Sequence, residues 1–175
     1  NGRDGKRDYK KAFKYYELAS KHDIWKGYYL MGEWNFNGNG VTKNIEKGNE
    51  FFQLAIKNKN PKALLQVGTF YYYNNKNYDY SKAKYYIEQA ANQKNSKAQC
   101  MLGIIYSEGK WAEADYQKAK YFYELSIKNN CLSAYINLSN LYYDGNGVSK
   151  DYSKSIYYLK EAAQKYNIDG LINIS

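Results

Sequence analysis

The sequence predicts an all-α fold built from a repeated pair of helices. Three observations carry this prediction: a unit of about 36 residues recurs, apolar residues within each unit follow three- and four-residue steps, and a short, mostly glycine-containing segment divides each unit in two. Small residues mark the period most clearly, because they stand five residues apart in each unit. They are Gly27 and Gly32, Ala63 and Gly68, Ala98 and Gly103, and Ala134 and Ser139.

The repeat frame defines the expected domain organisation. Complete repeats cover residues 25–60, 61–95, 96–131 and 132–167, with partial repeats at 1–24 and 168–175. We therefore expect a single repeat array over residues 1–175. Because the chain starts inside one unit and stops inside another, we also expect it to be a fragment of a longer array.

The fourth repeat shows how each unit divides into two helices. Ala134, Leu138 and Leu141 recur at helical spacing and predict the first helix. The segment 144–147 contains two glycines, which readily supply the positive φ of a helix-ending turn. The first helix should therefore end there.

A short polar residue should begin the second helix by accepting hydrogen bonds from free amides of its first turn. The residues at this position are Asp8, Asn44, Asp79, Asp115 and Asp151. Seven positions later stands an aromatic, and a small residue follows it after four more, which predicts packing of large against small side chains. The aromatics are Tyr15, Phe51, Tyr86, Phe122 and Tyr158.

The glycine within the first helix predicts a close helix–helix contact. Glycine in a helix interior costs about 0.5–1 kcal/mol relative to alanine. We expect an aromatic ring of a neighbouring helix to lie against the backbone at Gly32, Gly68 and Gly103.

Composition excludes several classes of protein. No run of eighteen apolar residues occurs, so no membrane-spanning helix is predicted. Cys100, Cys131 and the single histidine, His22, cannot supply four protein ligands for a structural zinc ion. We expect no metal and no cofactor. The spacing leaves open whether the two cysteines meet, and the compartment and oligomeric state stay undetermined.

The chain does not contain a recognisable catalytic pattern. His22 has no serine or cysteine nucleophile at a characteristic spacing. The loops at 37–41 and 144–148 contain two glycines each, but neither is followed by the Lys-Ser/Thr of a phosphate-binding loop. The sequence therefore predicts a protein that is not an enzyme.

The net charge of +9 permits an alternative function, binding of nucleic acid or of an acidic surface. Many of the lysines, however, recur at one position of the repeat, which favours a repeated solvated site over a phosphate-binding track. They are Lys47, Lys82, Lys118 and Lys154. We therefore expect nucleic acid to be an unfavoured partner.

The full pattern resembles the Sel-one-like repeat family, relatives of the tetratricopeptide repeats. The fourth repeat carries its residues: Ala134, Tyr142, Gly145, Gly147, Val148, Asp151, Tyr152, Lys154, Tyr158, Ala162 and Ala163. The resemblance implies a right-handed α/α superhelix, a solenoid of antiparallel helix pairs whose first helices line a concave groove. Asn35, where the family usually has tyrosine, and the segment 74–77 depart from the pattern.

The resemblance also implies a function, that of a non-catalytic scaffold or adaptor that binds a segment of a partner protein in the groove. Among the inward-facing positions transferred from the family, the expected contact residues are Lys26, Tyr29, Phe36, Lys62, Leu65, Tyr72, Tyr73, Ile104, Asn140 and Tyr143. The other transferred positions are Glu33, Asn37, Thr69, Lys97, Cys100, Ser107, Glu108, Ser133, Ile136 and Asp144. A cysteine-rich bacterial branch has been linked to penicillin binding, and this remains a remote alternative. The spacing of Cys100 and Cys131 does not match the cysteine pairs of that branch.

Overall fold

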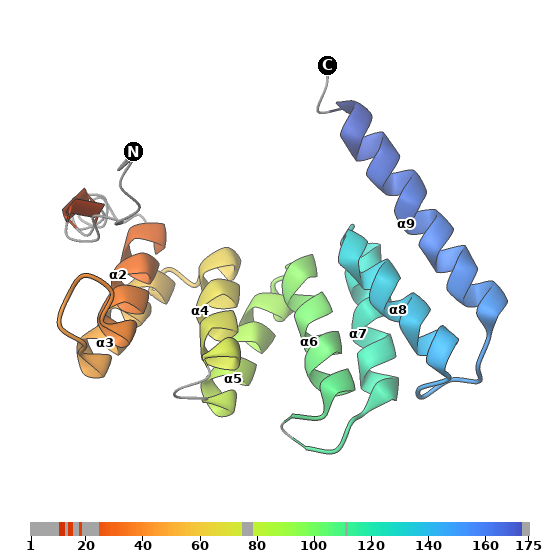
Figure 1. Cartoon of the computed structure of the whole chain (residues 1–175), viewed down its shortest axis with the longest axis horizontal. Helices are drawn as coiled ribbons and strands as arrows, with labels where there is room; N and C mark the ends of the chain where they lie inside the picture. Colours follow the sequence, from red (N-terminus) through yellow and green to blue (C-terminus); the bar gives the residue numbers. More distant parts are fainter. Residues whose placement is uncertain are drawn as a thin grey trace. The chain divides into compact units, whose positions relative to one another are not determined.

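The computed structural model describes residues 11, 12, 14, 15, 18, 25–74, 79–110 and 112–172, with side chains described as far as residue 165. These residues form helices and no strand, which confirms the all-α prediction (Figure 1). The helices with defined bounds are α2 (Trp25–Asn37), α3 (Ile45–Ile56), α4 (Pro61–Tyr73), α5 (Tyr80–Asn92), α6 (Ser96–Glu108), α7 (Tyr116–Lys128), α8 (Leu132–Asp144) and α9 (Tyr152–Ile172). His22, Asp8 and most of the partial repeat expected at 1–24 lie outside the described residues.

The chain divides into two compact units, Asn1–Tyr86 and Ile87–Ser175, with the boundary inside α5. In the first unit α2 packs against α3, and both contact α4. In the second unit α6 packs against α7, α8 packs against α9, and α7 joins the two pairs through its contact with α8 (Figure 1). Each helix pair corresponds to one predicted repeat.

The second helix of every complete repeat begins at the predicted capping residue. Side-chain oxygens of Asn44, Asp79, Asp115 and Asp151 accept hydrogen bonds at 2.9–3.0 Å from the amide three residues later. These bonds satisfy first-turn donors that have no partner within the helix. The sequence-based assignment of the helix starts is therefore confirmed at these four positions.

Glycine ends the first helix of the fourth repeat, as predicted. Gly145 has a φ of 77°, and its amide donates to the carbonyl of Leu141 at 2.9 Å. Gly38 ends α2 in the same way, with a φ of 79° and a bond of 2.8 Å to Trp34. Both residues use the left-handed conformation that favours glycine.

The glycine inside the first helix admits an aromatic ring, as expected, but the ring comes from a different position of the second helix. A Cβ on Gly32 would lie 2.5 Å from Phe52 Cδ1, and one on Gly103 would clash with the Tyr123 ring. The repeat pattern predicts Phe51 and Phe122 on this packing stripe. The apolar face of a helix is wide enough to include two adjacent positions, and the residue after the predicted aromatic, Phe52 or Tyr123, makes the contact with the glycine.

The predicted aromatic of the second helix instead stacks on a tyrosine of its own repeat. Tyr106 and Phe122 lie 5.5 Å apart with nearly parallel rings, and Lys118 Nζ lies 5.4 Å from the centre of the Tyr106 ring. Lys118 also pairs with the capping Asp115 at 2.8 Å. We call this group of four side chains the capped tyrosine stack. Equivalent groups are Asp79, Lys82, Tyr71 and Tyr86, and Asp151, Lys154, Tyr142 and Tyr158.

The first complete repeat lacks this stack. Asn35 replaces the tyrosine and donates to the carbonyl of Met31 at 2.8 Å, and Asn44 replaces the capping aspartate. Lys47 therefore has neither partner and lies over the ring of Phe51 instead, 5.9 Å from its centre. The departure at Asn35 changes this local group but leaves the helix pair intact.

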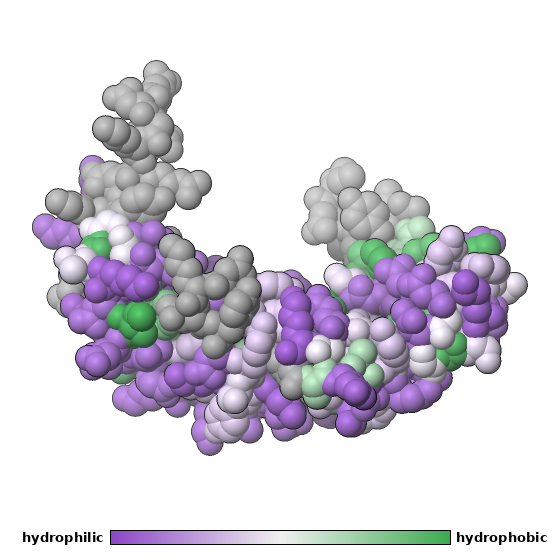
Figure 2. Space-filling model, turned by 60° about the horizontal axis from the view of Figure 1, so that its bottom comes forward, coloured by the Kyte–Doolittle hydropathy of each residue, from purple (hydrophilic) through white to green (hydrophobic). Residues whose placement is uncertain are grey.

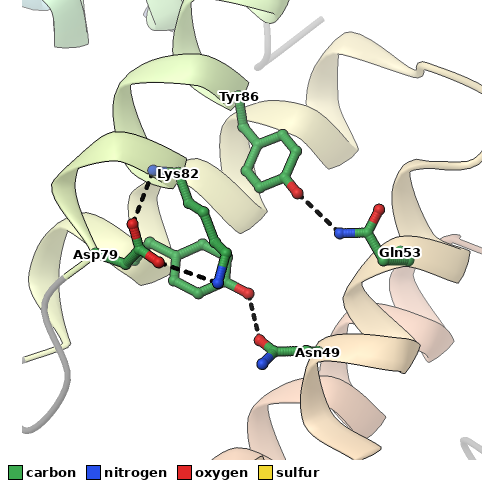
Figure 3. A network of polar contacts seen from close by, with 6 residues as sticks. Asn49, Gln53, Asp79, Lys82 and Tyr86 are labelled. Atoms are coloured by element: carbon green, nitrogen blue, oxygen red, sulfur yellow. Dashed lines mark hydrogen bonds and ion pairs between the residues drawn. The ribbon is translucent and has the colours of Figure 1, made fainter. Parts of the chain in front are cut away.

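Two polar contacts join adjacent repeats within the first unit (Figure 3). Tyr71 donates its hydroxyl proton to Asn49 Oδ1 at 2.5 Å, and Gln53 donates to Tyr86 Oη at 2.8 Å. The two side-chain amides, of Asn49 and Gln53, belong to α3. The two tyrosines belong to the capped tyrosine stack of the next repeat. The stack thus also provides the hydrogen-bonding partners for the preceding helix pair.

Candidate functional site

The first unit contains a pocket of about 580 Å³ between α2, α4 and the loop that follows α2. Its lining combines aromatic rings, side-chain amides and two opposite charges. The lining residues are Tyr29, Glu33, Asn37, Asn39, Lys43, Gln66, Thr69, Phe70, Tyr73 and Asn74. Such a mixture of apolar walls and a few polar groups is typical of ligand-binding pockets.

Two of the predicted contact residues line this pocket, Tyr29 on α2 and Tyr73 on α4. Tyr73 is 54% exposed, and its ring packs at a right angle against Tyr72, with centroids 4.8 Å apart. Lys26 and Lys62 are exposed and Leu65 is half-buried on the same two helices, but none of these three side chains belongs to the lining.

Phe36 and Tyr72 lie in the hydrophobic core. They are 3% and 1% exposed, and Phe36 packs its ring edge against Phe70, with centroids 5.1 Å apart. They occupy the twelfth position of their repeats, one residue before the exposed thirteenth position. One helical step is about 100°, which is enough to turn a side chain from the surface to the core. These two rings pack behind the lining residues Phe70 and Tyr73, respectively, and do not face the pocket.

Glu33 places a carboxylate in the pocket. Among the described residues no hydrogen bond or ion pair engages it, and burial raises its pKa above the ordinary value. Tyr29 lies close to Glu33 and Gln66, and burial raises the pKa of the Tyr29 hydroxyl to about 12. The tyrosine is therefore neutral and the carboxylate poorly solvated at neutral pH.

The loop after α2 supplies the residues of the pocket that the repeat pattern did not predict, Asn39 and Lys43. The turn at Gly38 brings the chain back toward the helix, since a Cβ on Gly38 would lie 3.1 Å from Lys43 Cβ. Helical periodicity carries no information on such a loop. On the helices, Gln66, Phe70 and Asn74 were also absent from the inward-facing positions.

The second unit has its own pocket, of about 510 Å³, between α6 and the start of α8. Ile104 is the predicted contact residue that lines it. The complete lining is Ser96, Lys97, Cys100, Met101, Ile104, Asn130, Cys131, Leu132 and Ser133. Asn140 and Tyr143 are exposed on α8 and lie outside this lining; Tyr143 packs edge-on against Tyr152, with ring centroids 5.3 Å apart.

The recurring lysines are engaged by their own repeats. Lys82, Lys118 and Lys154 each pair with the capping aspartate and lie over a tyrosine ring. Figure 2 shows a largely hydrophilic surface on the face it presents, with apolar colour confined to small separate patches. The positive charge at these positions thus has a local structural partner, which weakens the argument for a phosphate-binding track.

Two further properties concern only the part of the chain that the structure describes. Histidine, cysteine, aspartate and glutamate side chains do not gather there in groups of three or more that could hold a metal ion. The helices there are too short or too polar to cross a membrane.

Comparisons with known proteins agree with this architecture. The family model described as Sel1 repeat matches residues 1–23, 25–60, 61–95, 96–131 and 132–167. A Sel1 repeat protein from Oxalobacter formigenes has a similar structure, with a TM-score of 0.69 and 26% identity over 93% of this chain and 66% of that one. No match was found among curated proteins.

Two other solved structures share the fold. A protective antigen of uropathogenic Escherichia coli with an SLR fold gives a TM-score of 0.69 and 23% identity, covering 87% of this chain and 33% of that one. Cysteine-rich protein B of Helicobacter pylori gives 0.53 and 21%, covering 73% of this chain and 92% of that one. This chain thus spans less than two thirds of the Oxalobacter and Escherichia proteins.

Helix pairs of the predicted length, the capping residues and the matched repeats all lead to one assignment. Proteins built from such repeats are generally non-catalytic scaffolds for protein–protein interaction. The chain belongs to the Sel1 repeat family.

Proposed function

We propose that this chain is an adaptor that binds a lysine- or arginine-containing segment of a partner protein in the pocket between α2 and α4. The observation that carries the proposal is the Glu33 carboxylate, which is half-buried in the pocket and has no ion pair among the described residues. A partner cation would supply the missing counter-charge.

The carboxylate favours a cationic ligand for an energetic reason. Burial of a charge without a partner destabilises the ionised form, which is why the pKa of Glu33 is raised. A lysine or arginine side chain that enters the pocket restores the lost interaction and completes an ion pair shielded from water. Glu33 is also the only carboxylate in the described lining, so the charge preference of the pocket depends on one residue.

The rest of the lining suits an extended peptide. Tyr73, which is 54% exposed, offers a flat amphipathic surface to the aliphatic part of a long side chain, a common feature of interface hot spots, and the buried Tyr29 contributes to the pocket wall. Asn37 and Asn39 present exposed side-chain amides, each with a donor and an acceptor that match a peptide group. Lys43 provides a positive charge for an acidic or carboxyl-terminal group of the same segment.

Peptide selection tests the proposal and does not require an identified partner. Random peptides displayed on phage are selected on the immobilised chain, and the enriched peptides are measured against variants by fluorescence anisotropy. We expect enrichment of lysine or arginine, and a loss of affinity of about ten-fold or more in Glu33→Gln and in Tyr73→Ala. Tyr157→Ala serves as a matched control, because this similarly exposed tyrosine on α9 lies outside the pocket and outside the expected contact residues.

The outcomes separate the alternatives. Peptides without basic residues, or equal affinity for the chain and Glu33→Gln, contradict the role of the carboxylate. Equal losses in Tyr73→Ala and Tyr157→Ala place the binding surface elsewhere. Selection of acidic peptides whose binding disappears with added salt favours the acidic-surface alternative.

A further inference from the structure

Both cysteines of the chain lie in the pocket of the second unit. Cys100 belongs to α6, Cys131 immediately precedes α8, and the two side chains line the same cavity of about 510 Å³. They are free thiols, 4% and 7% exposed. Both also belong to the same hydrophobic core cluster, so the two side chains are near neighbours. The cavity gives a small molecule access to both.

Cys131 occupies a position that has asparagine in two other repeats. Asn60 and Asn95 stand at the N-caps of α4 and α6 and accept first-turn hydrogen bonds through their side chains. Cys131 is the N-cap of the 13-residue helix α8, but its side chain makes no capping hydrogen bond. A negatively charged group is stabilised at a helix N-terminus, and cysteine becomes such a group when it loses its proton.

The surroundings give the two thiols different roles. The interaction between the two thiols raises the pKa of Cys100, to which burial adds, and lowers the pKa of Cys131. Asn137 Nδ2 donates to Cys100 Sγ at 3.4 Å, and Lys97 adds a positive charge to the pocket lining. Cys131 is therefore the thiol of the pair that ionises more readily.

We propose that Cys131 and Cys100 form a thiol–disulfide exchange site for a small disulfide, with Cys131 as the attacking thiolate and Cys100 as the resolving thiol. The site lies within the second unit and is independent of the peptide-binding pocket around Glu33.

The reaction proceeds in two balanced steps. The Cys131 thiolate attacks one sulfur of the small disulfide, the S–S bond breaks, and one small thiolate leaves and takes up a proton. Cys100 then loses its proton and attacks the Cys131 sulfur, which forms the Cys100–Cys131 disulfide and releases a second small thiol. Two protein thiols are oxidised and one small disulfide is reduced to two thiols.

The product would join α6 of the third repeat to the start of α8 in the fourth. Because both side chains line one cavity, the two sulfur atoms can approach each other within it to form the bond. The described residues place no third histidine, cysteine, aspartate or glutamate with this pair. The arrangement thus favours reaction between the two thiols over a metal-binding site.

The test uses the full chain, reduced, freed of reductant and incubated with oxidised glutathione at pH 7. Intact mass spectrometry and peptide mapping should show loss of two hydrogen atoms and a Cys100–Cys131 link, with a higher melting temperature. Cys100→Ser should stop at a glutathione adduct on Cys131. Cys131→Ser should react about ten-fold more slowly, because the remaining thiol has the higher pKa. Tyr121→Ala, an exposed change on α7 outside the pocket, is the control and should react like the unmodified chain.

A second measurement avoids substitution of buried residues. The unmodified chain is alkylated with iodoacetamide across a pH series, and each cysteine is quantified by peptide mapping. Cys131 should react first, with a rate that levels off at lower pH than that of Cys100. Equal rates and pH profiles, or stable glutathione adducts on both cysteines without an internal disulfide, overturn the proposal. Circular dichroism establishes whether each serine variant is folded. If a variant is unfolded, the order in which Cys131 and Cys100 of the unmodified chain are alkylated tests the proposal instead.

Discussion

Ser139 and Ser155 face each other where α8 crosses α9, with their hydroxyl oxygens 3.0 Å apart and both side chains buried. At the equivalent crossing of α2 and α3 the residues are Gly32 and Gly48, and a Cβ on Gly48 would lie 3.0 Å from the carbonyl oxygen of Gly32. The same helix crossing is thus formed by backbone contact in one repeat and by a hydroxyl pair in another.

The serine pair should show strong energetic coupling. Ser139→Ala leaves the Ser155 hydroxyl buried without this partner, and we expect a loss of about 1–3 kcal/mol in the free energy of unfolding. The double variant Ser139→Ala with Ser155→Ala should lose less than the sum of the single changes. Urea denaturation followed by circular dichroism gives the free energy of unfolding of the chain, the two single variants and the double variant. Additive losses would show that the two hydroxyls are not energetically coupled.

Gly103 should not tolerate even alanine. The helix propensity of alanine favours the substitution by about 1 kcal/mol, but the new Cβ would clash with the buried ring of Tyr123. We expect Gly103→Ala to lose about 1–3 kcal/mol through overpacking. Thermal unfolding tests this, with Gly103→Ala plus Tyr123→Leu as the rescue variant. An unchanged midpoint in the single variant would contradict the close contact.

Asp79 should contribute to stability in a pH-dependent manner. Burial opposes its ionisation, but hydrogen bonds with the amide and ammonium groups of Lys82 outweigh this effect, so its pKa lies below the ordinary value (Figure 3). The contribution is therefore complete above the ordinary pKa and is lost as the pH falls through the lowered one. Asp79→Ala should cost about 1 kcal/mol at pH 7, and Asp79→Asn less, because asparagine still caps the helix.

Stability curves of the chain and of the two Asp79 variants between pH 7 and the acid range check this prediction. The difference between aspartate and asparagine should shrink as the carboxylate is protonated. A difference that stays constant would mean that the cap alone, and not the charge, stabilises α5.

Glu33 should have the opposite pH dependence. Burial raises its folded-state pKa above the ordinary value, so ionisation destabilises the fold at neutral pH, and this cost disappears as the pH falls through the raised pKa. Glu33→Gln should therefore be more stable than the unmodified chain at pH 7, by less than about 1 kcal/mol because the side chain is half exposed. Chemical denaturation at several pH values tests this, and a less stable variant would show that Glu33 has a structural partner.

Sequence patterns determined the repeat period, the helix pairs and the capping positions because these depend on residues close together in the chain. The side chains at positions twelve and thirteen were harder to assign. Tyr72 and Tyr73 are adjacent and identical, yet one is buried and the other exposed, because the rotation of α4 against its neighbours decides which faces the core. Proximity of Cys100 and Cys131 is likewise a tertiary property that spacing could not provide.

The capped tyrosine stack is formed within one helix pair, since the aspartate, lysine, tyrosine and second aromatic all come from the same repeat. A DNA segment that encodes one pair therefore carries its own helix start and its own stacked rings. Duplication or deletion of such a segment leaves the remaining pairs internally complete, which makes array length a property that can change in whole steps during evolution.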